Sequence, residues 1–97
     1  MSMQDMYLSA FKQEHWDSFV ELFDEWYAQL PNEWKEEARV KGIPEDISRV
    51  LLCEMKDSAL KWIDKKVPAL GDESPASYLE TEEGANALRA AILRMPR

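Results

Sequence analysis

Residues 74–95 read SPASYLETEEGANALRAAILRM, and this stretch predicts two successive helices. Ser74-Pro75 has the pattern of an N-cap and a first helical position, because serine accepts a backbone hydrogen bond and proline lacks an N–H. Thr81 repeats the capping chemistry, and the two glutamates after it suit the positive end of a helix. Apolar residues then recur at helical spacing: Ala85, Leu88, Ala91, Ile92 and Met95. We therefore expect a short helix followed by a longer amphipathic one.

The segment before this stretch predicts another helix, from Pro44 to Lys65-Lys66. Proline suits the first turn, acidic Glu45 and Asp46 suit the N-terminal end, and the lysines suit the C-terminal end. Its apolar residues are Ile47, Val50, Leu51, Leu52, Met55, Ala59, Leu60, Trp62 and Ile63. A compact turn follows, in which Gly71 can adopt the left-handed conformation.

The first part of the chain predicts one long helix from about Leu8 to Leu30. Its apolar residues form a broad, strongly aromatic stripe, and neither glycine nor proline interrupts it, so the helix would be about 35 Å long. Pro31 ends the pattern, and a short second helix would end at Lys41-Gly42. With no alternation long enough for a strand, we expect an all-α protein: a small bundle of four to five helices, with one long N-terminal helix and a compact C-terminal helical domain.

Length and charge restrict the possible functions. The 97 residues suffice for one domain, and the chain is 45% hydrophobic, with four Trp, three Tyr and three Phe to form a core. The net charge is −7, and residues 1–42 hold nine acidic and four basic side chains, for a charge of −5. Surfaces that bind nucleic acid or anionic membranes are normally basic, so both partners are disfavoured for this chain alone. The sequence also lacks a signal-peptide pattern and a bilayer-length apolar run, from which we expect a cytoplasmic protein.

Few residues in this chain suit catalysis or metal binding. His15 is the single histidine, which is too few for a histidine-rich zinc site or a di-iron bundle, and we expect it on a helix surface. Cys53 is the single cysteine, it lies in an apolar run, and we expect it to be a buried small hydrophobe. The acidic cluster of Glu33, Glu36 and Glu37 suits a solvated face. We therefore expect no enzyme, no cofactor and no bound metal.

A longer series of motifs begins at Ala59. In order, the chain shows Ala59-Leu60-Lys61-Trp62-Ile63, Pro68-Ala69-Leu70-Gly71, Ser74-Pro75, Tyr78-Leu79, Thr81, Glu83-Gly84-Ala85, Leu88 and Arg94. This order and spacing resembles the toxin-binding domain at the C-terminus of the Xre/MbcA/ParS antitoxins. We accordingly divide the chain into an N-terminal helical segment, residues 1–43, and an antitoxin-like toxin-binding domain, residues 44–97.

The resemblance implies that the protein is the antitoxin of a bacterial type II toxin–antitoxin system. Its partner would be a RES-domain toxin, an enzyme that consumes NAD, and the antitoxin would cover the toxin's active-site entrance chiefly through its C-terminal region. The toxin-binding residues implied are Ser74, Thr81, Glu82, Gly84, Arg89, Leu93, Arg94 and Arg97. Members of the family usually carry an upstream helix-turn-helix module, but residues 1–43 lack a recognisable one, which puts promoter binding in doubt.

Structural interpretations exist for the same residues, and two other functions stay open. The aromatic and leucine positions of the motif suit a core, Gly84 suits close helix packing, and the arginines suit the helix C-terminus. Arg89 lies one step from Leu88, which directs it towards the side opposite the core. The chain could instead be a helical protein-interaction module, or a homodimer formed through the aromatic stripe of the first helix. A degenerate DNA-binding regulator is the third possibility.

Overall fold

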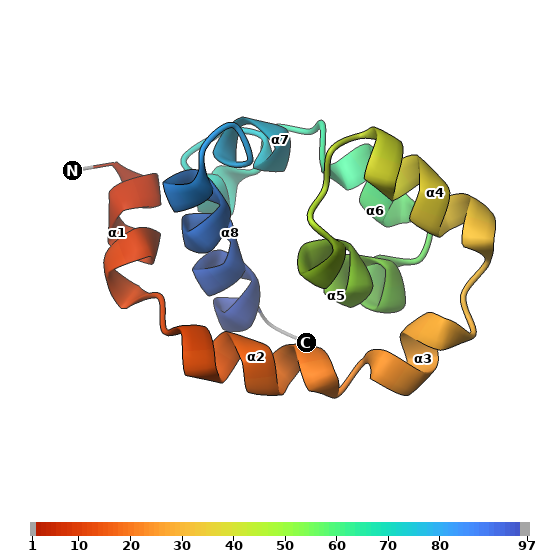
Figure 1. Ribbon diagram of the computed structural model, residues 1–97. Helices are drawn as coiled ribbons and strands as arrows, with labels where there is room; N and C mark the ends of the chain where they lie inside the picture. The colour runs from red at the N-terminus through yellow and green to blue at the C-terminus, as the bar shows by residue number, and fades with distance from the viewer. Residues whose placement is uncertain (1, 96–97) are drawn as a thin grey trace.

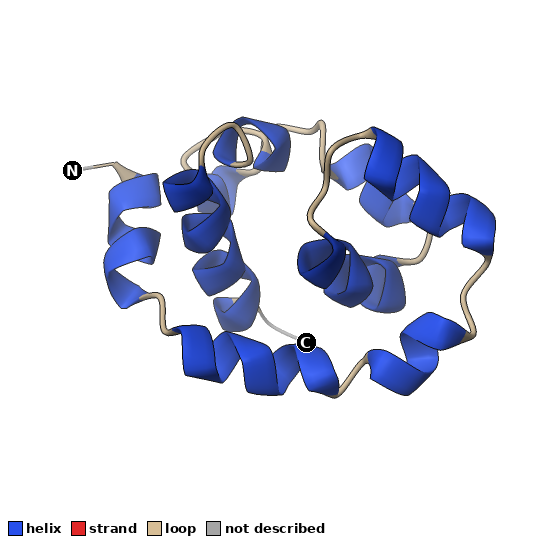
Figure 2. Cartoon of the chain, in the orientation of Figure 1, coloured by secondary structure: helices blue, strands red, loops and turns tan. Residues whose placement is uncertain are grey.

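The computed structural model describes residues 2–95, and the regular structure in that range is helical except for one isolated β-bridge (Figures 1 and 2). The helices are α1 (Met3–Ala10), α2 (Gln13–Glu21), α3 (Asp24–Ala28), α4 (Asn32–Val40), α5 (Glu45–Met55), α6 (Ser58–Trp62), the 3-10 helix η1 (Pro68–Leu70), α7 (Pro75–Tyr78) and α8 (Glu82–Arg94). The predicted all-α fold is confirmed. The predicted number of four to five helices is too low, because two of the expected helices are divided.

The first division affects the long helix expected over residues 8–30, and that prediction is wrong. Phe11 and Lys12 are extended, with ψ angles of 133° and 115°, and Phe23 caps a separate α3. α1 lies alongside α8, whereas α2 turns away to cross α8 and α5 (Figure 1). A straight rod could cover only one of these neighbours, but three short helices bury Trp16 completely and leave Phe23 only 6% exposed. Tertiary packing therefore outweighs the local helix propensity.

The second division affects the helix expected from Pro44 to Lys66, where one continuous helix is also wrong. α5 ends at Met55 and α6 begins at Ser58, because Lys56 has a φ of 56° and a ψ of −141°. The bend is held by two hydrogen bonds from Lys56, one from its backbone N–H to the Leu52 carbonyl (2.9 Å) and one from its ammonium to the Cys53 carbonyl (3.1 Å). It allows α6 to pack back against α5, so that buried residues of both helices enter one core.

The local predictions around α7 and α8 are confirmed. Gly71 is left-handed, with a φ of 73°. Ser74 Oγ accepts a hydrogen bond from the Ser77 N–H (3.2 Å), and Thr81 Oγ1 accepts one from the Gly84 N–H (2.9 Å). The Tyr78 hydroxyl donates a hydrogen bond to the Leu70 carbonyl (3.0 Å), and this bond joins α7 to η1. Burial raises the pKa of Tyr78 to about 12.

The core lies between α2, α5, α6 and α8. Its largest fully buried side chains are Trp16, Tyr78, Ile47, Leu51, Leu52, Ile63, Leu70, Leu88, Ile92, Val50 and Pro75. Cys53 is buried as expected, and burial raises the pKa of its thiol, while His15 is exposed as expected. None of the described helices is both long and apolar enough to span a membrane.

Candidate functional site

The open side of α8 is a narrow stripe of four residues. Glu82, Asn86, Arg89 and Leu93 are spaced by four, three and four residues, which places them on one side of the helix at about 100° per residue. Glu82 is exposed and the other three are partly exposed. We call these four residues the α8 stripe. Apart from the helix ends, the remaining α8 residues are buried: Gly84, Ala85, Ala87, Leu88, Ala90, Ala91 and Ile92.

The core covers one face of α8 and α1 covers a neighbouring face, so the α8 stripe is the side that stays open. Leu88 and Ile92 face the core as the spacing predicts, but Ala87 and Ala90 are also buried. Their small side chains suit the close approach of α1, which lies along α8 (Figure 1). α1 is further tied to the C-terminal part of the chain by a hydrogen bond from the Tyr7 hydroxyl to the Ala69 carbonyl (2.9 Å). A partner that approaches α8 in this structure therefore meets the stripe and the helix ends.

At the centre of the stripe, Arg89 is held by a carboxylate from α5. The Asp46 carboxylate accepts hydrogen bonds from Arg89 Nε (2.8 Å) and Nη2 (3.2 Å), and also from Trp16 Nε1 (2.7 Å). Arg89 Nη1 donates to Asn86 Oδ1 (2.7 Å). The Arg89 side chain is only 15% exposed. Partial burial alone would raise the pKa of Asp46, but the bonds from Arg89 and Trp16 outweigh it and hold that pKa below its ordinary value.

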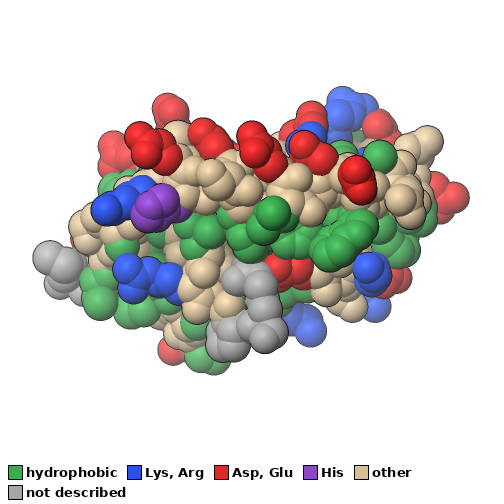
Figure 3. All heavy atoms as spheres, turned by 90° about the horizontal axis from the view of Figure 1, so that it is seen from below, with side chains coloured by type: hydrophobic (Ala, Val, Ile, Leu, Met, Phe, Trp, Pro, Cys, Tyr) green, Lys and Arg blue, Asp and Glu red, His purple; other side chains and the backbone are tan. Residues whose placement is uncertain are grey.

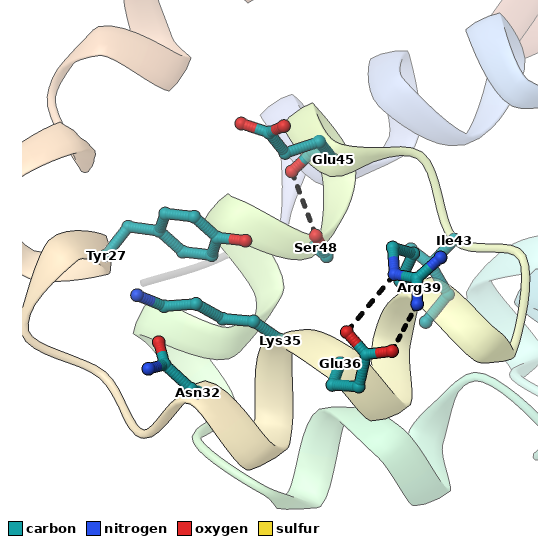
Figure 4. A pocket seen from close by; sticks show the side chains of 8 residues that line it. All are labelled: Tyr27, Asn32, Lys35, Glu36, Arg39, Ile43, Glu45 and Ser48. Carbon is teal, nitrogen blue, oxygen red and sulfur yellow. Dashed lines mark hydrogen bonds and ion pairs between the residues drawn. The ribbon is translucent and has the colours of Figure 1, made fainter.

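A separate hollow of about 280 Å³ lies between α3, α4 and α5 (Figure 4). Its charged groups are engaged with neighbours in the fold. Glu36 pairs with Arg39, and this pairing lowers the pKa of the Glu36 carboxyl. The Lys35 ammonium lies 4.7 Å from the centroid of the Tyr27 ring. The first contact lies within α4 and the second joins α4 to α3, while Glu45 pairs with Arg49 on α5, so the charges of the hollow take part in contacts within the fold.

Comparison with known families identifies the part of the chain that contains the stripe. Residues 50–95 match the family model described as the antitoxin Xre/MbcA/ParS C-terminal toxin-binding domain. This part of the chain is similar to that toxin-binding domain. No curated protein and no solved structure matches the chain. The match begins within α5 and ends just after α8, so it includes the whole stripe.

The residues that the resemblance implied for the toxin-binding domain fall into two groups. Glu82, Arg89 and Leu93 come together on the α8 stripe, and Arg94 is exposed at the last residue of the same helix. The other group lies at the start of α7 and α8, where Ser74 and Thr81 each use the side-chain oxygen as a helix cap. Arg97 lies outside the described residues.

Two of these positions have contacts inside the fold, and for Arg89 the direction expected from the helical spacing is wrong. Gly84 is buried, and a Cβ built on it would lie 2.0 Å from the Tyr78 carbonyl oxygen, so its role here is close packing of α8 against α7. Arg89 does not point away from the fold but towards α5, where its guanidinium is already bound by Asp46. Helical spacing directs Arg89 away from Leu88 and the core, but it cannot show that α5 lies on that side of α8.

Asp46, Asn86 and Trp16 were missed as parts of this site. Asn86 has the same spacing as its neighbours on the stripe, so the helical period could have indicated it. Asp46 was interpreted only as a favourable charge at the start of a helix, which the structure confirms. Its pairing with Arg89, 43 residues away in the sequence, could not be predicted from the residues around Asp46.

Proposed function

We propose that the protein is the antitoxin of a type II toxin–antitoxin system, and that it binds and blocks a RES-domain toxin that consumes NAD. The observation that carries the proposal is the match of residues 50–95 to an antitoxin toxin-binding domain. The function of such a domain is protein binding, and α8 supplies an open surface for it. The RES-domain partner rests on the resemblance of the motifs from Ala59 onwards.

The packing of α8 favours its use as a rigid binding element. α8 is held by α1, α2 and α7, and its central residue Arg89 is fixed by Asp46. A surface that is already ordered loses little conformational entropy on binding, which favours affinity. The α8 stripe would therefore meet the toxin without a large rearrangement of the antitoxin.

Within this surface, the C-terminal end offers the available positive charge. The Arg89 guanidinium is occupied by Asp46 and Asn86, whereas Arg94 is exposed beside Leu93. Arginine combines apolar packing with planar hydrogen bonding, and it is frequent at the centre of protein interfaces. A pocket that binds NAD needs cationic groups for the pyrophosphate, so Arg94 would meet acidic groups at the rim of the toxin's active site. Leu93 would supply the neighbouring apolar contact.

Co-expression with the product of the adjacent open reading frame tests the proposal. We expect the wild-type protein to restore growth and to co-purify with the toxin. Leu93→Ser and Arg94→Glu should each weaken rescue and complex formation, because both side chains lie at the open end of α8. Lys61→Glu is the matched control for the charge change, since Lys61 is exposed on α6 within the same family match.

The truncation that removes residues 94–97 extends this test. It should leave the helical circular dichroism intact, because most of the core precedes Arg94, and it should strongly weaken neutralisation. Full protection of cells by a folded truncated protein would show that the C-terminal end is not the inhibitory element. Binding to a toxin of a different enzyme class would contradict the RES-domain assignment while leaving the antitoxin role in place.

A further inference from the structure

Two large apolar side chains are exposed where α2 meets α3. Leu22 is 71% exposed and Trp26 is 61% exposed, and they lie one helical turn apart in the sequence. We call them the α2–α3 patch. Figure 3 shows an exposed hydrophobic area on the face of the molecule where these two helices lie. Neither helix is part of the matched toxin-binding domain, so the patch is separate from the α8 stripe.

The α2–α3 patch is supported from below by a chain of aromatic rings. Trp16, which is fully buried, lies 6.0 Å from Phe19, Phe19 lies 5.1 Å from Phe23, and Phe23 lies 5.8 Å from Trp26, as measured between ring centroids. The last two pairs have the edge-to-face geometry that aromatic pairs prefer. Trp26 is therefore the exposed end of a packed series. A tryptophan held in this way can act as an interface anchor with little loss of side-chain entropy on binding.

Negative charge borders the patch. Glu21 and Glu25 each precede a patch residue in the sequence, and both are exposed. Among residues 2–95, neither glutamate lies within ion-pair distance of a cation. Figure 3 shows a row of acidic side chains along one edge of the hydrophobic area. The partner surface that complements this pattern is apolar at its centre and basic at its edge.

We infer that the α2–α3 patch binds a protein segment in which apolar side chains are flanked by lysine or arginine. A second copy of this chain is a poorer occupant. A two-fold symmetric contact would place each patch against itself, and with the axis across the patch it would bring Glu21 and Glu25 of one copy close to those of the other. Like charges at such an interface are unfavourable, and the chain carries a net charge of −7.

A synthetic amphipathic peptide with leucine and lysine at helical spacing is a suitable probe. We would measure its binding to the full chain by fluorescence anisotropy, in the absence of any toxin. We expect saturable binding that weakens with salt, about tenfold weaker binding to Leu22→Ser or Trp26→Ser, and weaker binding to a Glu21→Gln, Glu25→Gln variant. Because both apolar side chains are exposed, these variants should retain the helical circular dichroism of the wild-type protein.

Val40→Ser is the matched control, because Val40 is 75% exposed on α4, near other glutamates but away from the patch. Its peptide binding should equal that of the wild-type protein. The inference is overturned by any of three results: no saturable binding, equal loss of binding in Val40→Ser and Trp26→Ser, or equal binding of a peptide with glutamate in place of lysine. A wild-type dimer in light scattering that Trp26→Ser dissociates would assign the patch to a second copy instead.

Discussion

Replacing Arg89 by methionine separates a structural role of this arginine from a direct role in toxin binding. The substitution keeps an unbranched apolar side chain but removes the guanidinium that donates to Asp46 from Nε (2.8 Å) and Nη2 (3.2 Å). The Asp46 carboxylate, whose side chain is 33% exposed, would keep the bond from Trp16 but lose its countercharge. The fold should therefore become less stable.

The size of the effect follows from the burial of the pair. Breaking a fully buried ion pair costs about 3–5 kcal/mol, whereas an exposed pair contributes about 0–1 kcal/mol. Because Arg89 is 15% exposed and Asp46 is 33% exposed, we place the loss between these two cases, at about 2 kcal/mol. For a domain of this size, a loss of that magnitude lowers the melting temperature by roughly 8–16 °C.

Urea unfolding, followed by circular dichroism and tryptophan fluorescence, measures the change in the free energy of unfolding. Arg39→Met is the control, since Arg39 pairs with Glu36 on the surface of α4 and its loss should leave the urea midpoint unchanged. A double-mutant cycle of Arg89→Met with Asp46→Asn should give a coupling of about 1–2 kcal/mol.

The pH dependence provides a second readout. Because the pKa of Asp46 is lowered in the folded state, its contribution to stability is fully present above the ordinary carboxyl pKa of about 4. The contribution is lost as the pH falls through the lowered pKa. The difference in stability between the wild-type protein and Asp46→Asn should therefore shrink only in that acidic range. Our interpretation is refuted if Arg89→Met is as stable as Arg39→Met and yet fails to bind the toxin.

Three further predictions concern the backbone and the charge of the chain. Gly84→Ala should destabilise the fold by about 2 kcal/mol in urea unfolding, because the clash with the Tyr78 carbonyl exceeds the gain of about 1 kcal/mol in helix propensity; unchanged or increased stability would contradict the packing described. Lys56→Gly should stabilise it by about 1 kcal/mol, since glycine tolerates the φ of 56°; a loss of stability would mean that the Lys56 ammonium bond outweighs the strain. A mobility-shift assay at about 0.1 M salt on the chain's own upstream region should show no discrete complex, because residues 1–42 carry a charge of −5; a saturable, sequence-dependent shift would contradict this.

Elements determined by neighbouring residues were predictable from the sequence. The caps at Ser74 and Thr81 and the left-handed Gly71 depend on hydrogen bonds and backbone conformations within a few residues, and all three are present. The bends at Phe11–Lys12 and at Lys56 carry no glycine or proline, so nothing local marks them. They arise because separate short helices bury more apolar surface against α8 and α5 than a continuous helix could. The local sequence pattern does not show which distant segments pack together, so it could not predict these bends.

Contacts between distant segments also affect how much each predicted toxin-binding residue can contribute to binding. The resemblance implied Glu82, Arg89 and Leu93 separately, and helical spacing places them on one side of α8, but it cannot show that Asp46 already holds the central arginine. Three of the five N–H donors of Arg89 are used within the fold and its side chain is only 15% exposed, so it has less to offer a partner than a free arginine. We therefore expect the C-terminal end of α8, where Leu93 and Arg94 are accessible, to contribute more to toxin binding than Arg89 does. Arg94→Glu should accordingly reduce toxin binding more than stability, and Arg89→Met should do the reverse.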